Sequence, residues 1–515
     1  MSAEEPEHSH AFDGRLLEKR RALLEGGAQI YPYTYDSVQS VASAREAFLL
    51  AESAGDQSTE TLRLAGRIWA RRDMGRTVFM DLRDHSGKIQ LYFGRAALPE
   101  GAWGHLAQLD LGDLLGVEGT LCRTRSGELT LRVEALAVLA KSVVPLPVGK
   151  ESEGRAFGRL RDSESRYRDR HLTWMLDGDA RARIVLRSRL VSALRNRLAA
   201  EEFLEVETPA LSPLYGGAEA RPFRTRAWAL GEAPLYLRIA PELHLKRYLV
   251  AGFERVFTVC GNFRNEGIDR SHNPEFTMLE WYQAYSDYRE QAERFERLVA
   301  DVCADLHGAA RVEYQGTDLD FTPPWRRLTV LEALAQYAGI DAGALSAAEL
   351  VSAARERGLE AEEGLSWGRA VALLFEEVCE PHLVQPTLVL DHPRAISPLA
   401  RRRRGDERLA ERFEAYACGM ELGNAYSELN DPVEQVERLE EQRRNRRDPE
   451  YQDHPLDGDF IHAMGCGMPP AGGVGLGVDR LAMLLSDAPN IREVIPFPLT
   501  RPRGFSAQNE EERNG

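Results

Sequence analysis

Short alternations of apolar and polar residues follow one another in the first third of the chain. Five runs place an apolar side chain at every second position, at residues 62–69, 77–82, 88–93, 114–122 and 129–136. This period is typical of half-buried strands, and turns such as Ser86-Gly87 separate the runs. Residues 103–109 form a helical interval among them. Five short strands and one helix predict a small Greek-key barrel.

Farther along the chain, the apolar residues recur at helical spacing. Residues 184–200 carry a leucine at every fourth position from 186 to 198, and an alternating strand follows at 203–208. Residues 288–306 and 351–377 repeat the helical period. Because apolar stripes usually mean burial, we interpret these segments as core elements beside a sheet.

Two further alternating runs, residues 254–260 and 275–281, flank a polar loop and predict an antiparallel hairpin. Arg264 lies at the end of the first strand, where a planar guanidinium can hold a phosphate through two parallel hydrogen bonds. Phe276 on the second strand can stack on a base. An exposed hairpin with ordinary surface charge fits this pattern equally well.

Alternating glycines at residues 472–477 run directly into an apolar segment at 481–485. The glycines favour a strand whose backbone approaches a ligand or another strand closely, and the apolar segment predicts a buried helix. A flexible linker is the alternative, but Pro469-Pro470 and the helix bound the run as linkers seldom are. Arg480 at the junction is expected to face Phe276 across an adenine.

The composition indicates a large protein with more than one domain. The chain has 515 residues with 43% hydrophobic content, enough for at least two cores. No apolar stretch approaches the ~20 residues of a membrane span, and residues 1–10 lack the apolar centre of a signal peptide. We therefore expect a cytoplasmic protein without membrane contact. The six cysteines are scattered without a Cys-x-x-Cys pair, which indicates reduced thiols.

A net charge of −16 means that any nucleic-acid partner must be held by local basic patches. A barrel of the oligonucleotide-binding (OB) kind presents aromatic and polar side chains to unstacked bases. A solvated charged face is the alternative for each basic patch. The candidates are Arg15, Lys19, Arg20 and Arg21 on an amphipathic helix, the pair Arg71-Arg72, and the run Arg401, Arg402, Arg403 and Arg404.

The hairpin, the glycine-rich strand and the segment 184–209 resemble the three signature motifs of the class II aminoacyl-tRNA synthetases, in the order of that family. Residues 236–243, 252–257 and 424–432 extend the resemblance to the lysyl branch, of subclass IIb. The resemblance implies an α+β fold, with an antiparallel catalytic sheet flanked by helices and preceded by an N-terminal OB barrel. It also implies a homodimer formed through residues 184–209.

Domain boundaries follow from the same resemblance and from changes in the residue pattern. They are a helical extension at 1–56, the OB domain at 57–145, a linker at 146–172, the catalytic domain at 173–505 with a helical insertion around 290–380, and a polar tail at 506–515.

The implied reaction joins L-lysine to tRNA(Lys) with ATP and Mg²⁺. Arg264 and Arg480 are the implied catalytic residues, with Arg264 bridging the lysine carboxylate and the α-phosphate. ATP would be bound by Arg264, Glu266, His272, Asn273, Phe276 and Arg480. The spacing of Glu414 and Glu421 alone favours surface charge, unless a bulge puts both on one strand face. The resemblance makes them Mg²⁺ ligands, and carboxylate oxygens suit that cation.

A pocket for lysine must replace the water around its ammonium with carboxylate and hydroxyl oxygens. The resemblance assigns the α-amino group to Glu242 and the Gly216 carbonyl, the carboxylate to Asn424 and Arg264, and the ε-amino group to Glu428, Tyr282 and Glu280. It also assigns the central anticodon uridine to Arg72, Phe79 and Gln90, with Phe79 stacking on the base.

Three alternatives stay open at this point. Aspartyl- and asparaginyl-tRNA synthetases share the barrel and the motif order, but an aspartate pocket needs more cations. A non-catalytic RNA-binding paralogue would be expected to lose Arg264, Glu421 or Arg480, which are present. A ligase that transfers lysine to a protein or lipid would lack the barrel. The loop around Arg270 and Ser271 departs from the family pattern and leaves the contact to the γ-phosphate undefined.

Overall fold

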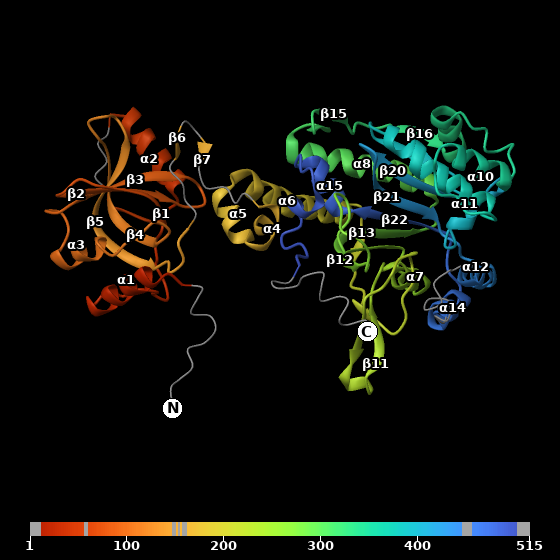
Figure 1. The fold of residues 1–515 in the computed structure, drawn as a ribbon, viewed down its shortest axis with the longest axis horizontal. Coiled ribbons are helices and arrows are strands. Elements are labelled where there is room, and N and C mark those ends of the chain that lie inside the picture. The colour runs from red at the N-terminus through yellow and green to blue at the C-terminus, as the bar shows by residue number, and fades with distance from the viewer. Residues whose placement is uncertain are drawn as a thin grey trace. The chain divides into compact units, whose positions relative to one another are not determined.

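The structure, a computed structural model, describes residues 12–55, 60–146, 151–152, 155–156, 162–444 and 456–501. The chain divides into two compact units, Met1–Arg161 and Asp162–Gly515 (Figure 1). The first eleven residues, the polar tail and most of the interval 147–161 lie outside the described residues. Each unit is described by itself.

The first unit is a closed five-stranded barrel, as the alternation predicts. Its strands are β1 (Leu62–Asp73), β2 (Thr77–Arg83), β3 (Lys88–Gly94), β4 (Leu114–Arg123) and β5 (Leu129–Ala140), hydrogen-bonded in the order β1-β2-β3-β5-β4. Every second residue points inward, so that Leu64, Leu82 and Leu91 are fully buried. The helices are α1 (Gly14–Glu25), α2 (Val41–Ser53) and α3 (Glu100–Leu106), and β6 (Glu151–Ser152) pairs with β7 (Arg155–Ala156).

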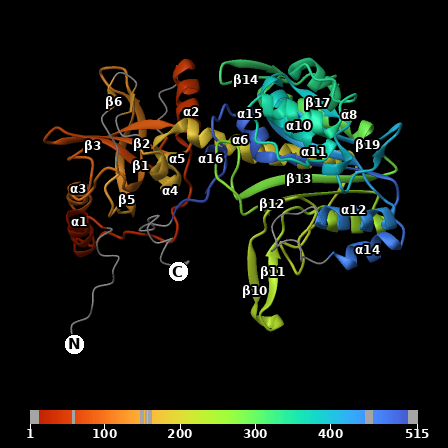
Figure 2. The ribbon, with the colours of Figure 1, turned by 45° about the vertical axis from the view of Figure 1, so that its right-hand side comes forward.

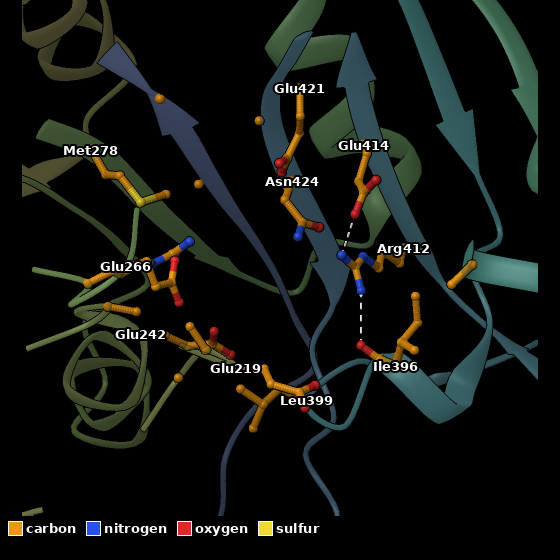
Figure 3. A pocket seen from close by; sticks show the side chains of 18 of the residues that line it. Glu219, Glu242, Glu266, Met278, Ile396, Leu399, Arg412, Glu414, Glu421 and Asn424 are labelled. Atoms are coloured by element: carbon orange, nitrogen blue, oxygen red, sulfur yellow. Dashed lines mark hydrogen bonds and ion pairs between the residues drawn. The ribbon is translucent and has the colours of Figure 1, made fainter. Parts of the chain in front are cut away.

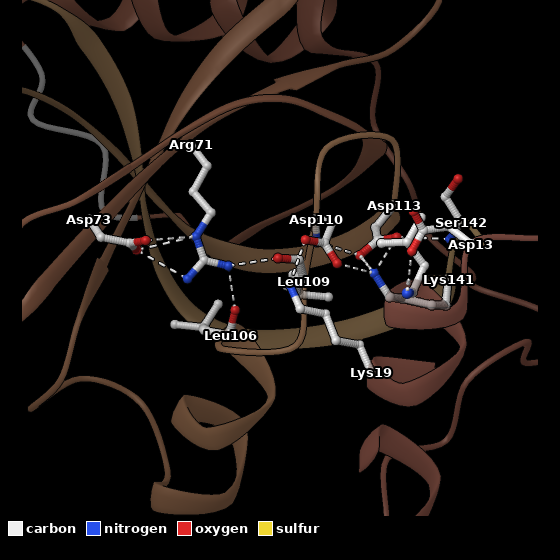
Figure 4. Close-up of polar contacts among 11 residues, drawn as sticks. Asp13, Lys19, Arg71, Asp73, Leu106, Leu109, Asp110, Asp113, Lys141 and Ser142 are labelled. Carbon is white, nitrogen blue, oxygen red and sulfur yellow. Dashed lines mark hydrogen bonds and ion pairs between the residues drawn. The ribbon is translucent and has the colours of Figure 1, made fainter. Parts of the chain in front are cut away.

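An internal ion-pair network ties α1 to the barrel (Figure 4). The Lys141 ammonium is buried and lies 2.7 Å from Asp110 and 2.9 Å from Asp113. Lys19 of α1 lies 2.6 Å from the other oxygen of Asp110. Arg71 donates to the carbonyls of Leu106 and Leu109 and pairs with Asp73. Two members of the predicted basic patches, Lys19 and Arg71, therefore hold the barrel together.

The second unit is built on an eight-stranded, mainly antiparallel sheet. Its strands are β8 (Leu204–Glu205), β12 (Arg255–Phe263), β13 (Glu275–Ala284), β16 (Arg326–Thr329), β17 (Thr387–Leu390), β20 (Arg412–Ala417), β21 (Met420–Ser427) and β22 (Ala471–Gly477). Their order is β16-β17-β20-β21-β22-β13-β12-β8, and only the end pairs β16·β17 and β12·β8 are parallel. The predicted hairpin is β12–β13, and the glycine-rich run is the central strand β22. The α+β fold class is thereby confirmed.

Helices on one face of this sheet form the main core. They are α6 (Gly178–Ala200), α8 (Tyr288–His307) and α15 (Val478–Leu485), and their buried residues form one cluster with Phe257, Trp281 and Phe413 of the strands (Figure 2). Leu190, Leu194 and Leu198 of α6 are fully buried, as the leucine spacing predicts. Elsewhere on the sheet, α7 (Glu242–Val250) and α14 (Gly458–Gly465) pack with β12 and β13 around Tyr282.

The helical insertion has a small hydrophobic core of its own. It contains α9 (Val330–Ala333), α10 (Ala347–Glu356), α11 (Trp367–Leu374) and the turns η3 (Leu334–Ala338), η4 (Phe375–Cys379) and η5 (Glu380–His382). Because α8 belongs to the main core, the distinct insertion begins near Val330. Other elements are α4 (Ser163–Arg168), α5 (Arg170–Leu176), β9 (Leu211–Ser212), β10 (Arg224–Ala227), β11 (Ala233–Leu237), β14 (Arg311–Tyr314), β15 (Thr317–Asp320), β18 (Arg402–Arg403), β19 (Asp406–Ala410), α12 (Pro432–Arg444) and α16 (Ile491–Val494).

Three arginines of the run 401–404 form ion pairs within the second unit, while Arg402 and Arg404 remain exposed at its surface. Arg402 lies 3.2 Å from Glu434, Arg403 2.6 Å from Asp391, and Arg404 2.7 Å from Asp287. These ion pairs offset part of the positive charge that the sequence analysis considered for RNA binding. Among the described residues, no helix is long and apolar enough to cross a membrane, and all six cysteines have free thiols.

Candidate active site

A cavity of about 1180 Å³ lies over the central strands of the second unit. Figure 3 shows Glu242, Glu266 and Met278 on one side and Glu414, Glu421 and Asn424 on the other. The cavity brings together nearly all residues predicted to bind ATP, metal or amino acid: Gly216, Glu242, Arg264, Glu266, His272, Asn273, Phe276, Glu280, Tyr282, Glu414, Glu421, Asn424 and Arg480. Glu428 does not line it but is buried directly behind the wall.

Arg264 continues from the end of β12, and its backbone N–H donates to Pro274 across the hairpin at 2.8 Å. Its guanidinium carbon lies 5.1 Å from the centre of the Phe276 ring. The Arg264 Nε is buried and has no hydrogen-bond partner among the described residues. A buried donor without a partner costs free energy unless a ligand accepts its hydrogen bond. Arg264 is thus poised to receive an anion.

Arg480 lies in the first turn of α15 and faces the hairpin loop. It donates to the Glu421 carbonyl at 2.7 Å and to His272 Nε2 at 2.9 Å. His272 Nδ1 lies 2.8 Å from Asp269. In the structure, the Arg264 guanidinium therefore lies over the Phe276 ring, and Arg480 is hydrogen-bonded to His272 of the hairpin loop.

Arg270 points away from the cavity. It donates to the Pro489 carbonyl at 2.8 Å and to the Tyr314 hydroxyl at 3.2 Å. These contacts fix the base of the hairpin loop against the segment after α15. Arg480 contacts the loop through His272, Arg264 lies at its start, and Arg270 holds the loop in place.

Glu414 and Glu421 come from the β20–β21 hairpin. The register shifts between Ala415 and Tyr416, and this bulge puts both carboxylates at the cavity. Glu414 is bonded to Arg412 and to the Tyr416 hydroxyl. Burial alone would raise the pKa of Glu414, but neighbouring His392 and Arg412 lower it, so the carboxylate is ionised.

Two acidic residues of the insertion, Glu376 and Glu380, also line this end of the cavity. Burial raises the pKa of Glu380 to about 8, and burial together with the Glu414 charge raises the pKa of Glu376. Within the described ranges, no three Asp, Glu, His or Cys side chains form a preassembled metal cage. Glu414 and Glu421 nevertheless offer hard oxygen donors at an open cavity, which fits a cation that arrives with a triphosphate and keeps water ligands.

The opposite end of the cavity is strongly acidic. Glu242 opens α7, Glu280 lies on β13, and the Tyr282 hydroxyl donates to Glu280 at 3.3 Å. Burial, reinforced by the Glu242 charge, raises the pKa of Glu280 to about 8. Sequence reasoning missed Lys246, whose ammonium is fully buried between Glu242 and Glu428. The spacing of four residues between Glu242 and Lys246, which places both on one helix face, is the signal that could have revealed this pair.

Gly473 of β22 separates Glu428 from the cavity. A Cβ at this position would overlap both a Glu428 carboxylate oxygen and the Tyr282 ring. Glu428 Oε1 is buried without a hydrogen-bond partner in the part of the chain that the structure describes. The missing side chain of Gly473 therefore leaves a cationic group in the cavity a short route to Glu428.

Three barrel residues predicted to read a base lie together on β1, β2 and β3 of the first unit. Arg72 pairs in register with Phe79, and its guanidinium donates to Gln90 at 2.9 Å. The Phe79 ring lies 5.3 Å from that of Tyr92, which sequence reasoning did not select. Two neighbouring rings with polar groups beside them form a surface on which a base can stack.

Comparison with known proteins matches both units. Residues 162–501 match the family model of class II tRNA synthetases for D, K and N, and residues 62–139 match the OB-fold nucleic acid binding domain. A lysine–tRNA ligase of Methanoculleus marisnigri is 44% identical over 98% of each chain. One from Dehalococcoides mccartyi is 45% identical over 96% of this chain and 98% of its own. One from Pelotomaculum thermopropionicum is 46% identical over 85% and 86%.

Proposed function

The chain belongs to the class II lysine–tRNA ligase family, and from this premise we propose that it activates L-lysine with ATP and transfers it to tRNA(Lys). It is an ATP-dependent aminoacyl-tRNA ligase. The observation that carries the choice of amino acid is the acidic end of the cavity, where Glu242, Glu280 and Glu428 meet. An aspartate side chain would meet the carboxyl groups of Glu242 and Glu280 at the cavity wall there.

In the first step, a lysine carboxylate oxygen attacks the α-phosphorus of ATP, and the bond from that phosphorus to the pyrophosphate oxygen breaks. Lysyl-adenylate and pyrophosphate are the products. In the second step, a hydroxyl at the 3′ end of tRNA attacks the lysyl carbonyl and AMP leaves. Two anions must meet in the first step, so the site has to orient them and neutralise their charge.

Arg264 is proposed to bridge the two anions. Its unpartnered buried Nε and its position over Phe276 support this role. Arg480, held by Glu421 and His272, is proposed to contact the nucleotide on the side of the cavity opposite Phe276. Glu266, His272 and Asn273 complete the ATP set, and Asn424 contacts the lysine carboxylate.

At the other end, Gly216 and Glu242 are proposed to hold the α-amino group, while Glu280, Tyr282 and Glu428 hold the ε-amino group. Glu414 and Glu421 would hold Mg²⁺, which when bound neutralises part of the triphosphate charge. The bulge between Ala415 and Tyr416 supports that pair, because it brings both carboxylates to the cavity.

Arg72, Phe79 and Gln90 are proposed to bind the anticodon, with the catalytic unit acting on the other end of the same tRNA. A homodimer is proposed from the apolar residues exposed along α6, β8 and β9, namely Val185, Leu204 and Leu211. A cytoplasmic location is proposed from the substrates of the reaction.

The test is ATP–pyrophosphate exchange with each of the twenty standard amino acids. Exchange that depends on lysine alone is the expected result. Exchange with aspartate or asparagine would overturn the proposed substrate. No exchange with any amino acid, combined with binding of tRNA, would favour the RNA-binding paralogue.

A further inference from the structure

Lys246 is a fully buried lysine at the acidic end of the cavity. Its Nζ donates to Glu242 Oε1 at 2.7 Å and lies 2.7 Å from Glu428 Oε2. Burial would lower the pKa of this ammonium, but the two carboxylates outweigh burial and raise its pKa. Lys246 therefore stays charged, and it connects the residue proposed for the α-amino group with one proposed for the ε-amino group.

The charges at this end of the cavity balance only when Lys246 is counted. Burial raises the pKa of Glu280 and of Glu428 to about 8, and an arriving ammonium favours their ionised forms. With all three ionised, Glu242, Glu280 and Glu428 supply three carboxylates, and Lys246 and Arg264 supply two cations. One negative charge is left over. Lysine, with two ammonium groups and one carboxylate, carries one net positive charge. Without Lys246, two negative charges would face the same substrate, and burial makes such an excess costly.

The two oxygens of the Glu428 carboxylate have different surroundings. Glu428 gives Oε2 to Lys246, while its Oε1 has no hydrogen-bond partner among the described residues and lies beside Gly473 at the cavity wall. One oxygen is thus held by the ion pair with Lys246, and the other lies against Gly473 of the cavity wall. A carboxylate held on one side by a buried ammonium cannot rotate freely, so its second oxygen is already oriented.

We propose that Lys246 is a positioning residue that orients Glu242 and Glu428 and favours the ionised form of Glu428, so that this end of the cavity accepts a substrate with one net positive charge. The inference rests on the proposed lysine ligase function and deepens it. Lys246 touches no substrate atom in this arrangement and acts only through the two glutamates.

The predicted consequence is a change in how lysine binding depends on pH. The titratable and charged groups that face Lys246 and its partners are Glu242 of α7, Glu280 and Tyr282 of β13, Glu428 after β21, Tyr426 of β21, and Arg264. Removing the ammonium removes the positive charge that lowers the pKa of Glu428, so this carboxyl group holds a proton more tightly. The lysine ammonium must then displace that proton, which becomes easier as pH rises.

The experiment compares Lys246→Met and Lys246→Arg with the wild-type enzyme. ATP–pyrophosphate exchange is measured between pH 6 and 8.5, with KM determined separately for lysine and ATP. In Lys246→Met, KM for lysine is expected to exceed the wild-type value about tenfold at pH 7, and this ratio should grow toward pH 6 by up to a factor of ten per pH unit and shrink toward one at pH 8.5. KM for ATP should stay within about twofold. Lys246→Arg keeps the charge and should retain the wild-type pH slope.

Two outcomes would overturn the inference. One is an unchanged pH slope for lysine in Lys246→Met. The other is a uniform loss in kcat and in both KM values, which is what a purely structural lysine would produce. If Lys246→Met does not fold, the slope of Lys246→Gln decides by the same criteria. Failure of the wild-type enzyme to activate lysine would instead refute the proposed function, so the two failures are distinguishable.

Discussion

Glu280 is a buried carboxyl group whose pKa is raised to about 8 by burial and by the neighbouring Glu242 charge. Folding therefore favours its protonated form. The stability that this form contributes is fully present below the unfolded pKa near 4.5 and is lost as pH rises through 8. Bound lysine is expected to reverse the preference, because its ammonium would stabilise the ionised carboxylate.

Glu280→Gln is expected to make thermal stability less dependent on pH. Between pH 6 and 8, the wild-type enzyme without lysine should lose free energy of unfolding at about 1.4 kcal/mol per pH unit from this group, and the variant should not. Thermal unfolding at pH 6 and 8.5 measures the difference. Added lysine should raise the wild-type Tm more at pH 8.5 than at pH 6. Equal pH dependence in both proteins would contradict the assignment.

Gly473→Ala tests the route from the cavity to Glu428. The added methyl group would overlap the Glu428 carboxylate and the Tyr282 ring. Overpacking of this kind costs about 1–3 kcal/mol, so KM for lysine should rise about tenfold or more. KM for ATP should change little, since the nucleotide end of the cavity is not touched.

Gly465→Ala is the matched control, because nothing lies within 4 Å of a Cβ at that helical position. Its KM values should match those of the wild type. A normal KM for lysine in Gly473→Ala would show that the ε-amino group does not approach Glu428 past this glycine.

Single residues differ in how far the sequence predicts them. Arg264 and Phe276 follow from local alternation, because strand periodicity determines which side chains end a hairpin. Lys246 does not, because one of its two partners, Glu428, is distant in sequence and only the folded sheet brings it close. The direction of Arg270 depends in the same way on Pro489, which no local pattern reveals.

At the scale of elements, strands and helices with strong periodicity were predicted well. The five barrel strands and the β12–β13 hairpin lie within a few residues of their predicted bounds. The predicted strand at 203–208 shrinks to the two residues of β8, because only that part pairs with β12. The last part of the predicted linker forms α4 and α5, since polar helices carry weak apolar periodicity.

The next prediction concerns Phe79 on strand β2 of the barrel. Phe79→Ala removes the ring beside Tyr92, and stacking on a base is worth about 1–3 kcal/mol. KM for tRNA(Lys) in aminoacylation should rise by roughly 5-fold to 100-fold, while lysine-dependent pyrophosphate exchange stays unchanged. Phe79→Trp keeps a stacking surface and should recover most of the affinity. Unchanged charging by Phe79→Ala at limiting tRNA would refute the anticodon assignment.

At the scale of the whole molecule, the two units have separate hydrophobic cores. In the proposed function, amino-acid activation needs only the cavity of the second unit, whereas charging of tRNA needs both units. This division explains why a net charge of −16 is compatible with an RNA substrate. We propose that recognition depends on local surfaces such as that of Arg72 and Phe79, and that the acidic remainder discourages nonspecific RNA binding.

The last prediction tests the proposed homodimer. Val185 of α6 is 44% exposed, although most apolar residues of this helix face the core. If a second chain covers it, Val185→Arg places a charge in an apolar interface, which costs several kcal/mol. Light scattering should then find wild type at the mass of two chains and Val185→Arg at the mass of one. Val433→Arg on α12, at a residue 67% exposed, should stay dimeric. A fully active wild-type monomer would refute the dimer, and a dimeric Val185→Arg would place the interface elsewhere.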